Sequence, residues 1–222
     1  MWRTIAFSLL WVGLVAYAFA LAPPNSPETP ALLRQLASGQ WQDLNPLLVA
    51  LFNLMGIWPI AYASVLASDG SGQPVRAWPF ALTAFAVGAF ALLPYLALRR
   101  ANPTLAGGKS GPLKLLDRRA TGILLLIASV PLLGYGLLWG DWHAFAQQWQ
   151  SNRFVHVMSL DFCLLCALFP SLLGDDMARR GLHEPAIFWA VSLIPLLGPL
   201  AYLSARPPLP EGSGVAHQAS PH

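Results

Sequence analysis

The chain has 222 residues, of which 55% are hydrophobic and only 10% are charged, with a formal net charge of +3 at pH 7. Typical soluble domains carry about 25% charged residues, so this composition excludes a water-soluble enzyme, a disordered chain and a coiled coil. The two cysteines are too few for a disulfide scaffold. Because the basic residues lie between apolar runs, we expect a protein whose partner is the lipid bilayer and which binds no nucleic acid.

Six apolar segments are long enough to cross a bilayer, which takes about 20 helical residues. Helices are expected because lipid offers no partner for backbone N–H and C=O groups. The segments cover residues 5–22, 45–67, 78–98, 120–139, 154–174 and 186–204. The first segment could instead be a signal peptide, but Pro23 disfavours cleavage, so we expect it to stay as a span. The sequence thus predicts an all-α polytopic membrane protein with six transmembrane helices.

A basic loop, residues 101–119, separates the third predicted span from the fourth, and Arg99 and Arg100 come directly before it. Short loops rich in Lys and Arg lie in the cytoplasm, so we expect this loop inside and both chain ends outside. Residues 207–222 are rich in Pro, Gly and Ser and are expected to form a disordered tail.

The two halves of the chain share a pattern. Gln40-Trp41-Gln42 and Gln148-Trp149-Gln150 each precede a predicted span, and the twelfth residue after each Trp is polar, Asn53 in one half and Asp161 in the other. The residues just before these spans mix apolar and polar side chains, which is typical of short helices on the membrane surface. Two apolar hairpins could share such features by chance, but the matched offset favours a duplication.

We therefore expect two three-helix repeats, residues 1–100 and 120–206. A repeat with three crossings leaves the chain on the opposite side, so the second copy would be inverted. Inverted repeats are common in secondary transporters, which bind substrate near the bilayer midplane and use broken helices there. Prolines within or near the span ends indicate kinks or breaks of this kind; they are Pro59, Pro94, Pro131, Pro170, Pro195 and Pro199.

Asp161 is the only formally charged side chain within a predicted span. Such residues are costly in lipid and face a partner, a cavity or a proton path. Three interpretations stay open. Asn53 donates its amide N–H groups to the Asp161 carboxylate across the repeat interface, or Asp161 is protonated without a special role, or it handles protons or ions.

His156, near the outer end of the fifth predicted span, is a candidate contact for the magnesium of a pigment or for a haem iron. A hydrogen bond at the interface is the more ordinary role of a single histidine. Cys163 shares its helix face but lies two turns away, about 10 Å, and Asp161 points elsewhere, so no metal site is expected. No cofactor is predicted, and chlorophyll or another pigment stays open as a ligand.

Asp175, Asp176, Arg179 and Arg180 form a compact polar segment that we place in the cytoplasm. This segment is either a helix-ending turn with weak local salt bridges or a docking site for a partner protein. The sequence contains no G-x-G-x-x-G, P-loop, Ser/His/Asp or H-E-x-x-H pattern. No catalytic residue is identified, and we do not expect an enzyme.

Four stretches carry a resemblance to a known family: residues 45–62 (NPLLVALFNLMGIWPIAY), 77–98 (AWPFALTAFAVGAFALLPYLAL), 154–180 (FVHVMSLDFCLLCALFPSLLGDDMARR) and 192–203 (SLIPLLGPLAYL). They resemble small polytopic membrane proteins of cyanobacteria and plant plastids, and the second half is also similar to a bacterial three-helix domain of unknown function. The resemblance implies a thylakoid or bacterial inner membrane, and it supplies no catalytic residues.

Two functions are compatible with these observations. The first is an accessory or assembly component of a larger membrane complex, such as a photosynthetic one. The second is a small secondary transporter with a polar site at the repeat interface. A polar cavity between the halves would favour transport, whereas a dry core with apolar outer grooves would favour the accessory role.

Overall fold

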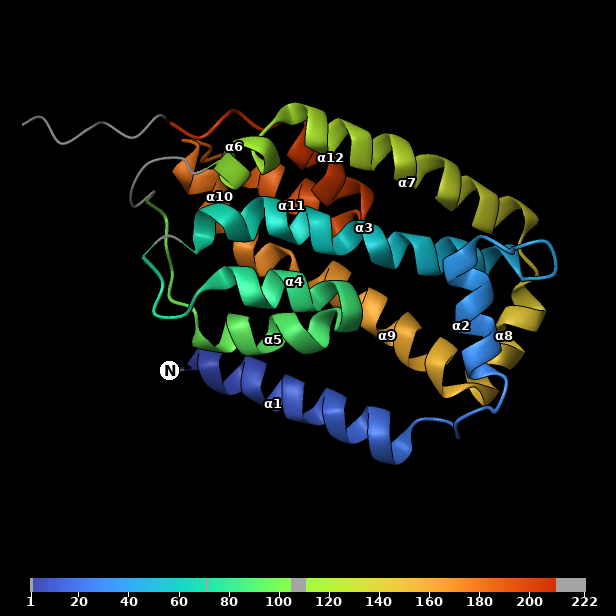
Figure 1. The fold of residues 1–222 in the computed structure, drawn as a ribbon. Helices are drawn as coiled ribbons and strands as arrows, with labels where there is room; N and C mark the ends of the chain where they lie inside the picture. Colours follow the sequence, from blue (N-terminus) through green and yellow to red (C-terminus); the bar gives the residue numbers. More distant parts are fainter. Residues whose placement is uncertain (1, 71, 105–110, 211–222) are drawn as a thin grey trace, which may run out of the picture.

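The computed structural model describes residues 2–70, 72–104 and 111–210, and the regular elements within these ranges are all helical (Figure 1). Four helical segments are long and apolar enough to cross a membrane, as expected of an integral membrane protein. They are α1 (Trp2–Ala16) with the π-helix η1 (Tyr17–Leu21), α3 (Pro46–Asp69), α7 (Arg119–Trp139), and α9 (Arg153–Leu168) with α10 (Pro170–Arg179). The expectation of six spans is therefore wrong.

Two short amphipathic helices, α2 (Thr29–Ser38) and α8 (Trp142–Ser151), lie at the end of the bundle where α3 and α9 begin (Figure 1). Each one precedes a long helix, as the mixed composition of these segments predicts. Asn45 and Asn152 cap α3 and α9 by accepting hydrogen bonds from backbone N–H groups of the first turn. We call this end of the bundle the surface-helix end.

The third predicted span is a hairpin of two short helices, α4 (Ala77–Val87) and α5 (Ala89–Leu98). Each is about 15 Å long at 1.5 Å per residue, half the thickness of a bilayer core of about 30 Å. The chain reverses at Gly88, whose φ of +50° favours glycine. Gln73 before α4 and Arg100 after α5 exchange two hydrogen bonds of 2.8 Å, so both ends of this hairpin lie together.

The sixth predicted span is a second hairpin, formed by α11 (Pro185–Leu193) and α12 (Leu197–Ala205). Its turn contains Pro195, and the next residue, Leu196, adopts a positive φ of 60°. Arg206, just after α12, donates to Asp176 of α10 at 3.0 Å, which brings the end of this hairpin back to its beginning. Both hairpins therefore enter the bundle and leave it at the same end, which we call the hairpin end.

Each half consequently has two crossings and a returning hairpin. Both halves begin at the hairpin end (Figure 1), so the premise for an inverted second copy, an odd number of crossings, does not hold. The predicted loop 101–119 contains a short helix, α6 (Gly111–Leu116). Residues 105–110 of that loop and residues 211–222 of the predicted tail lie outside the described residues.

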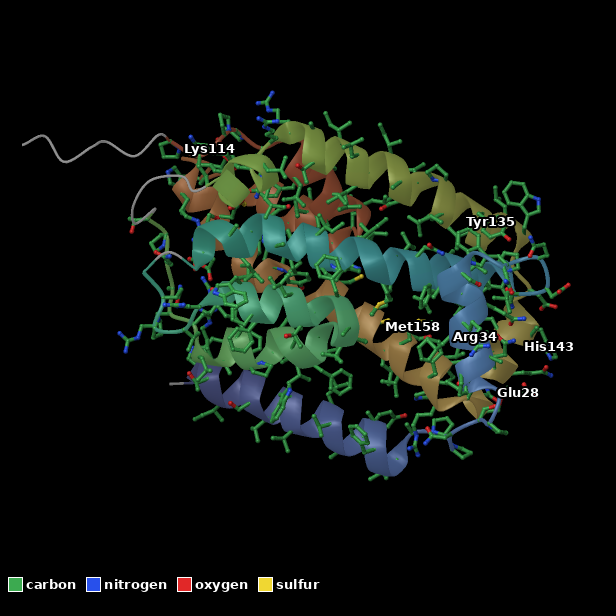
Figure 2. All side chains as sticks on the ribbon, viewed as in Figure 1. Glu28, Arg34, Lys114, Tyr135, His143 and Met158 are labelled. Atoms are coloured by element: carbon green, nitrogen blue, oxygen red, sulfur yellow. The ribbon has the colours of Figure 1, made fainter. Side chains whose placement is uncertain are left out.

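The basic residues are concentrated at the hairpin end. Among the described residues, those at this end are Arg3, Arg76, Arg99, Arg100, Lys114, Arg118, Arg119, Arg179, Arg180 and Arg206. Arg34 and Arg153 belong to the surface-helix end, and Figure 2 shows Arg34 opposite Lys114. The positive-inside rule therefore predicts that the hairpin end faces the cytoplasm. It predicts the start of α1 and the end of α12 on that same side, opposite to the orientation expected from six spans.

Labelling of single cysteines distinguishes four spans from six. In a chain whose Cys163 and Cys166 are replaced by Ala, Arg76→Cys and Arg100→Cys introduce exposed thiols on either side of the first hairpin. We expect an impermeant maleimide to reach both from the same side of the membrane, and to reach Arg34→Cys only from the other side. Labelling of positions 76 and 100 from opposite sides would show that residues 78–98 cross the membrane as a third span.

Candidate functional site

The interface between the halves is closed by aromatic side chains. Trp58 and Tyr62 of α3 pack on Phe169, which lies between α9 and α10, with ring centroids 5.6–6.0 Å apart. All three are fully buried. The Tyr62 hydroxyl donates to the Leu165 carbonyl at 2.6 Å, so its polar end is satisfied inside the core. The centre of this interface is therefore mainly aromatic, and it contains no polar pair of Asn53 and Asp161.

A buried ion-pair cluster fixes the first hairpin to the end of α3. Asp69 accepts hydrogen bonds from the Tyr95 hydroxyl at 2.5 Å and from Nε of Arg99 at 2.8 Å. Tyr95 and Arg99 stand 26 and 30 residues after Asp69. The Asp69 and Arg99 side chains are completely buried, so each needs the other for its charge to be tolerated there.

The same three residue types, at the same spacing, fix the second hairpin to α10. Asp176 accepts from the Tyr202 hydroxyl at 2.7 Å and from Arg206 at 3.0 Å, and these residues stand 26 and 30 positions after it. The two clusters are related by an offset of 107 residues. Arg180 adds a third donor to Asp176 at 2.9 Å.

Contacts between the halves follow this offset too. Arg99 donates to the Ser171 carbonyl of the second half at 3.3 Å, and Arg206 donates to the Ser64 carbonyl of the first half at 3.0 Å. Ser64 and Ser171 are themselves 107 positions apart. The contacting pair Tyr62 and Phe169 also differs by 107, as residues beside a twofold axis would.

The predicted docking segment lies inside this network. Asp176, Arg179 and Arg180 are buried, and Asp175 binds Arg99. Burial lowers the pKa of Arg180, but the carboxylates of Asp176 and Asp117 more than offset this and hold it above its ordinary value. These side chains belong to the end of α10 and its junction with α11, and among them Asp175 keeps a partly exposed side chain.

Asn53 and Asp161 do not meet. The Asn53 amide donates to the Val49 carbonyl within α3 at 2.8 Å. Asp161, 3% exposed, accepts from the backbone N–H of Ala89 at 2.9 Å. Asp161 therefore caps the first residue of α5 at the tip of the first hairpin, where the break at Gly88 leaves N–H groups without helical partners.

His156 is buried and held on both faces. It stacks between Trp149 and Tyr17, with centroids 4.2 and 5.7 Å away. Its Nδ1 lies 2.8 Å from the Trp149 carbonyl and its Nε2 lies 2.8 Å from the Tyr17 hydroxyl. Because a carbonyl only accepts, Nδ1 donates a proton to Trp149, and in the tautomer with this single ring proton Nε2 accepts from the Tyr17 hydroxyl. A pigment magnesium or a haem iron would have to displace Tyr17.

A cavity of about 580 Å³ is lined by η1, which continues α1, and by α3, the tip of the first hairpin and α9. We call it the α1–α9 cavity. Asp161 lines it beside the hairpin tip, and Arg153 and Asn25 line it toward the surface-helix end. Arg153 donates to the Pro23 carbonyl at 2.8 Å, which ties the start of α9 to the segment after η1. In Figure 2, Met158, another lining residue, lies on α9 beside the hairpin tip.

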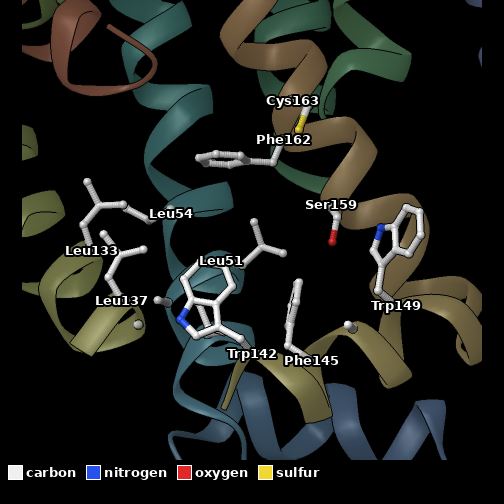
Figure 3. Close-up of a pocket in the computed structure, with 14 residues that line it drawn as sticks. Leu51, Leu54, Leu133, Leu137, Trp142, Phe145, Trp149, Ser159, Phe162 and Cys163 are labelled. Atoms are coloured by element: carbon white, nitrogen blue, oxygen red, sulfur yellow. The ribbon is translucent and has the colours of Figure 1, made fainter. Parts of the chain in front are cut away.

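A second hollow of about 430 Å³ lies between α3, α7, α8 and α9 (Figure 3). Trp142 and Phe145 of α8 close one end of it, and Leu133 and Leu137 line the α7 side. Ser159, one of its few polar lining residues, donates its hydroxyl to the Val155 carbonyl at 2.7 Å. This groove offers an apolar surface of the kind that a lipid chain fills.

Sequence reasoning missed the most constrained polar residues, Asp69, Tyr95, Arg99, Tyr202 and Arg206. A pattern that occurs once in each half identifies them. In this pattern a Tyr follows an Asp by 26 residues, and an Arg follows the Tyr by four. Among the described residues there is no group of three or more His, Cys, Asp and Glu that could hold a metal ion. No family model matches this chain, and neither a curated protein nor a solved structure matches it.

Proposed function

We propose that this chain is an accessory or assembly component of a larger membrane complex and has no catalytic role. The observation that carries this proposal is the packed centre of the interface between the halves. Trp58, Tyr62 and Phe169 fill this centre, and the Asp69 and Asp176 clusters lie beside it at the hairpin end. Among the described residues no polar passage crosses this centre, and the two hollows between the halves are lined mainly by apolar side chains. The alternative is a transport site formed by Asn53 and Asp161. It requires these two side chains to meet, and each is hydrogen-bonded to a different backbone group instead.

The matched contacts favour a duplicated architecture with parallel copies. In this proposal residues 1–100 and 120–206 are copies of one unit, which consists of a span, a surface helix, a second span and a returning hairpin. The offset of 107 residues relates the ion-pair clusters and the contacts that cross between the halves. The resemblance to plastid and cyanobacterial proteins supports a photosynthetic membrane as the location, with a bacterial inner membrane as the other candidate.

Purification from native membranes in a mild detergent tests the accessory role. We expect the tagged chain to migrate with a larger complex, and mass spectrometry to recover the same subunits at fixed ratios. A particle that contains this chain alone, with its lipids, would contradict the proposal. Absorbance of the same fraction shows whether the complex carries pigment.

Crosslinking can identify the face that contacts the complex. The outer faces of α1 and α7 are the least buried parts of the four spans, and Leu9 and Val130 are exposed on them. A photoreactive amino acid at position 130 or 9 should capture a protein partner from one of these faces and only lipid from the other. Capture of lipid alone from both positions would speak against a partner at either helix.

A further inference from the structure

Only one of the two carboxyl oxygens of Asp161 receives a hydrogen bond from a described residue. Its Oδ1 accepts from Ala89, while no described residue donates to its Oδ2, and the side chain lines the α1–α9 cavity. A buried carboxyl group that keeps an unpaired oxygen loses the free energy of a hydrogen bond. This cost disappears if a molecule in the cavity supplies the missing bond.

The mouth of the cavity faces lipid. Phe19 of η1, and Phe85 and Val87 at the hairpin tip, line it and are 73%, 54% and 44% exposed. Such large apolar side chains around an opening favour entry of a molecule dissolved in the bilayer rather than one dissolved in water. The volume of about 580 Å³ lies within the range of about 300–1,000 Å³ that small-molecule sites occupy.

The cavity is elongated along α9. Its lining residues Arg153, Val157 and Asp161 recur every four positions, on one face of the helix. At 1.5 Å per residue Asp161 lies about 12 Å from Arg153 along the helix axis. Between them the cavity is lined by apolar side chains, including Phe52, Phe154 and Met158. An occupant must therefore have an apolar body and place one small polar group beside Asp161.

We infer that the α1–α9 cavity is a binding site for an apolar alcohol, whose hydroxyl bonds to Oδ2 of Asp161. An alcohol is suited to either form of the side chain, because its O–H donates to a carboxylate and its oxygen accepts from a protonated acid. An amine pairs well only with the carboxylate, and a ketone only with the acid. Prenyl, sterol and aromatic alcohols share this chemistry.

The test uses farnesol, an apolar alcohol, and farnesene, the corresponding hydrocarbon without a hydroxyl. Native mass spectrometry of the full chain in detergent measures how much of each stays bound. We expect the wild-type chain to retain farnesol at about tenfold lower concentration than farnesene, which is the effect of one hydrogen bond to a buried charged or acidic group. Equal retention of the two compounds would overturn the inference.

Two further variants locate the site. Gly56 lines the cavity from α3, and a Cβ added there meets nothing within 4 Å, so Gly56→Phe should fold and abolish farnesol binding. Gly134→Phe on α7, also with open space around it and outside the cavity, should bind like the wild type. Farnesol binding that survives Gly56→Phe would place the site elsewhere.

Asp161→Ala tests the hydrogen bond itself. This variant should bind farnesol and farnesene equally, and unchanged farnesene binding would show that it is folded. A preference for farnesol that persists in folded Asp161→Ala would overturn the assignment of the hydroxyl to this residue. If the variant does not fold, the comparison of Gly56→Phe with Gly134→Phe still decides the location.

Discussion

Gly88→Ala is expected to disrupt the first hairpin and to lower the stability of the protein by about 3 kcal/mol or more. The φ of +50° at this position disfavours any residue with a side chain. In addition, an added Cβ would lie 1.7 Å from Oδ2 of Asp161, far inside van der Waals contact. Thermal unfolding of the purified protein in detergent measures the loss.

Gly134→Ala is the matched control, because the position lies within α7 and its added Cβ meets nothing within 4 Å. It should leave stability unchanged or slightly improved, since alanine favours helices. Addition of Asp161→Ala to Gly88→Ala removes the clash but not the backbone strain, so it should recover part of the loss. Wild-type stability in Gly88→Ala would show that the chain does not turn at this residue.

Asp176→Asn should be the most damaging single change at the hairpin end. Asp176 is completely buried and receives hydrogen bonds from Tyr202, Arg180 and Arg206. Loss of its charge removes the carboxylate that both arginines bind and leaves them only Asp117, 2.8 Å from Arg180 and 4.0 Å from Arg206. Breaking a buried ion pair in this way costs about 3–5 kcal/mol. The midpoint of thermal unfolding should fall accordingly.

Two comparisons make this result specific. Asp43→Asn changes an exposed carboxylate and should alter stability by no more than about 0.5 kcal/mol. Asp69→Asn should resemble Asp176→Asn, because Asp69 occupies the corresponding position in the first cluster. If Asp176→Asn melts like the Asp43→Asn control, the cluster does not stabilise the hairpin.

Composition alone was enough to predict a helical membrane protein, and mixed polarity was enough to predict the two surface helices. The number of spans was not predictable in the same way. Residues 78–98 form an apolar run of full spanning length, in which Pro94 was expected to mark a kink, but the chain reverses at Gly88. Glycine is frequent within transmembrane helices, so its presence does not by itself indicate a reversal. The turn is stabilised by Asp161, which lies 73 residues further along the chain.

The polar site was predictable in part. Asp161 was correctly singled out as an unusual residue, but its partner is a backbone N–H that becomes available only because the helix is broken at Gly88. No sequence pattern marks such a donor. The buried clusters were missed because Arg99 and Arg206 stand just outside apolar runs, where positive charge is ordinarily explained by the cytoplasmic loops.

The even number of crossings in each half bears on how such a chain could have arisen. Duplication of a unit with three crossings requires an ancestor that inserted in both orientations, or a second copy that reversed its charge bias. A unit that begins and ends on the same side of the membrane requires neither an ancestor with two orientations nor a reversed charge bias. Two identical units could have associated side by side and then been joined by fusion of their genes, with residues 101–119 as the join. Co-expression of the two halves as separate polypeptides would recreate that earlier assembly.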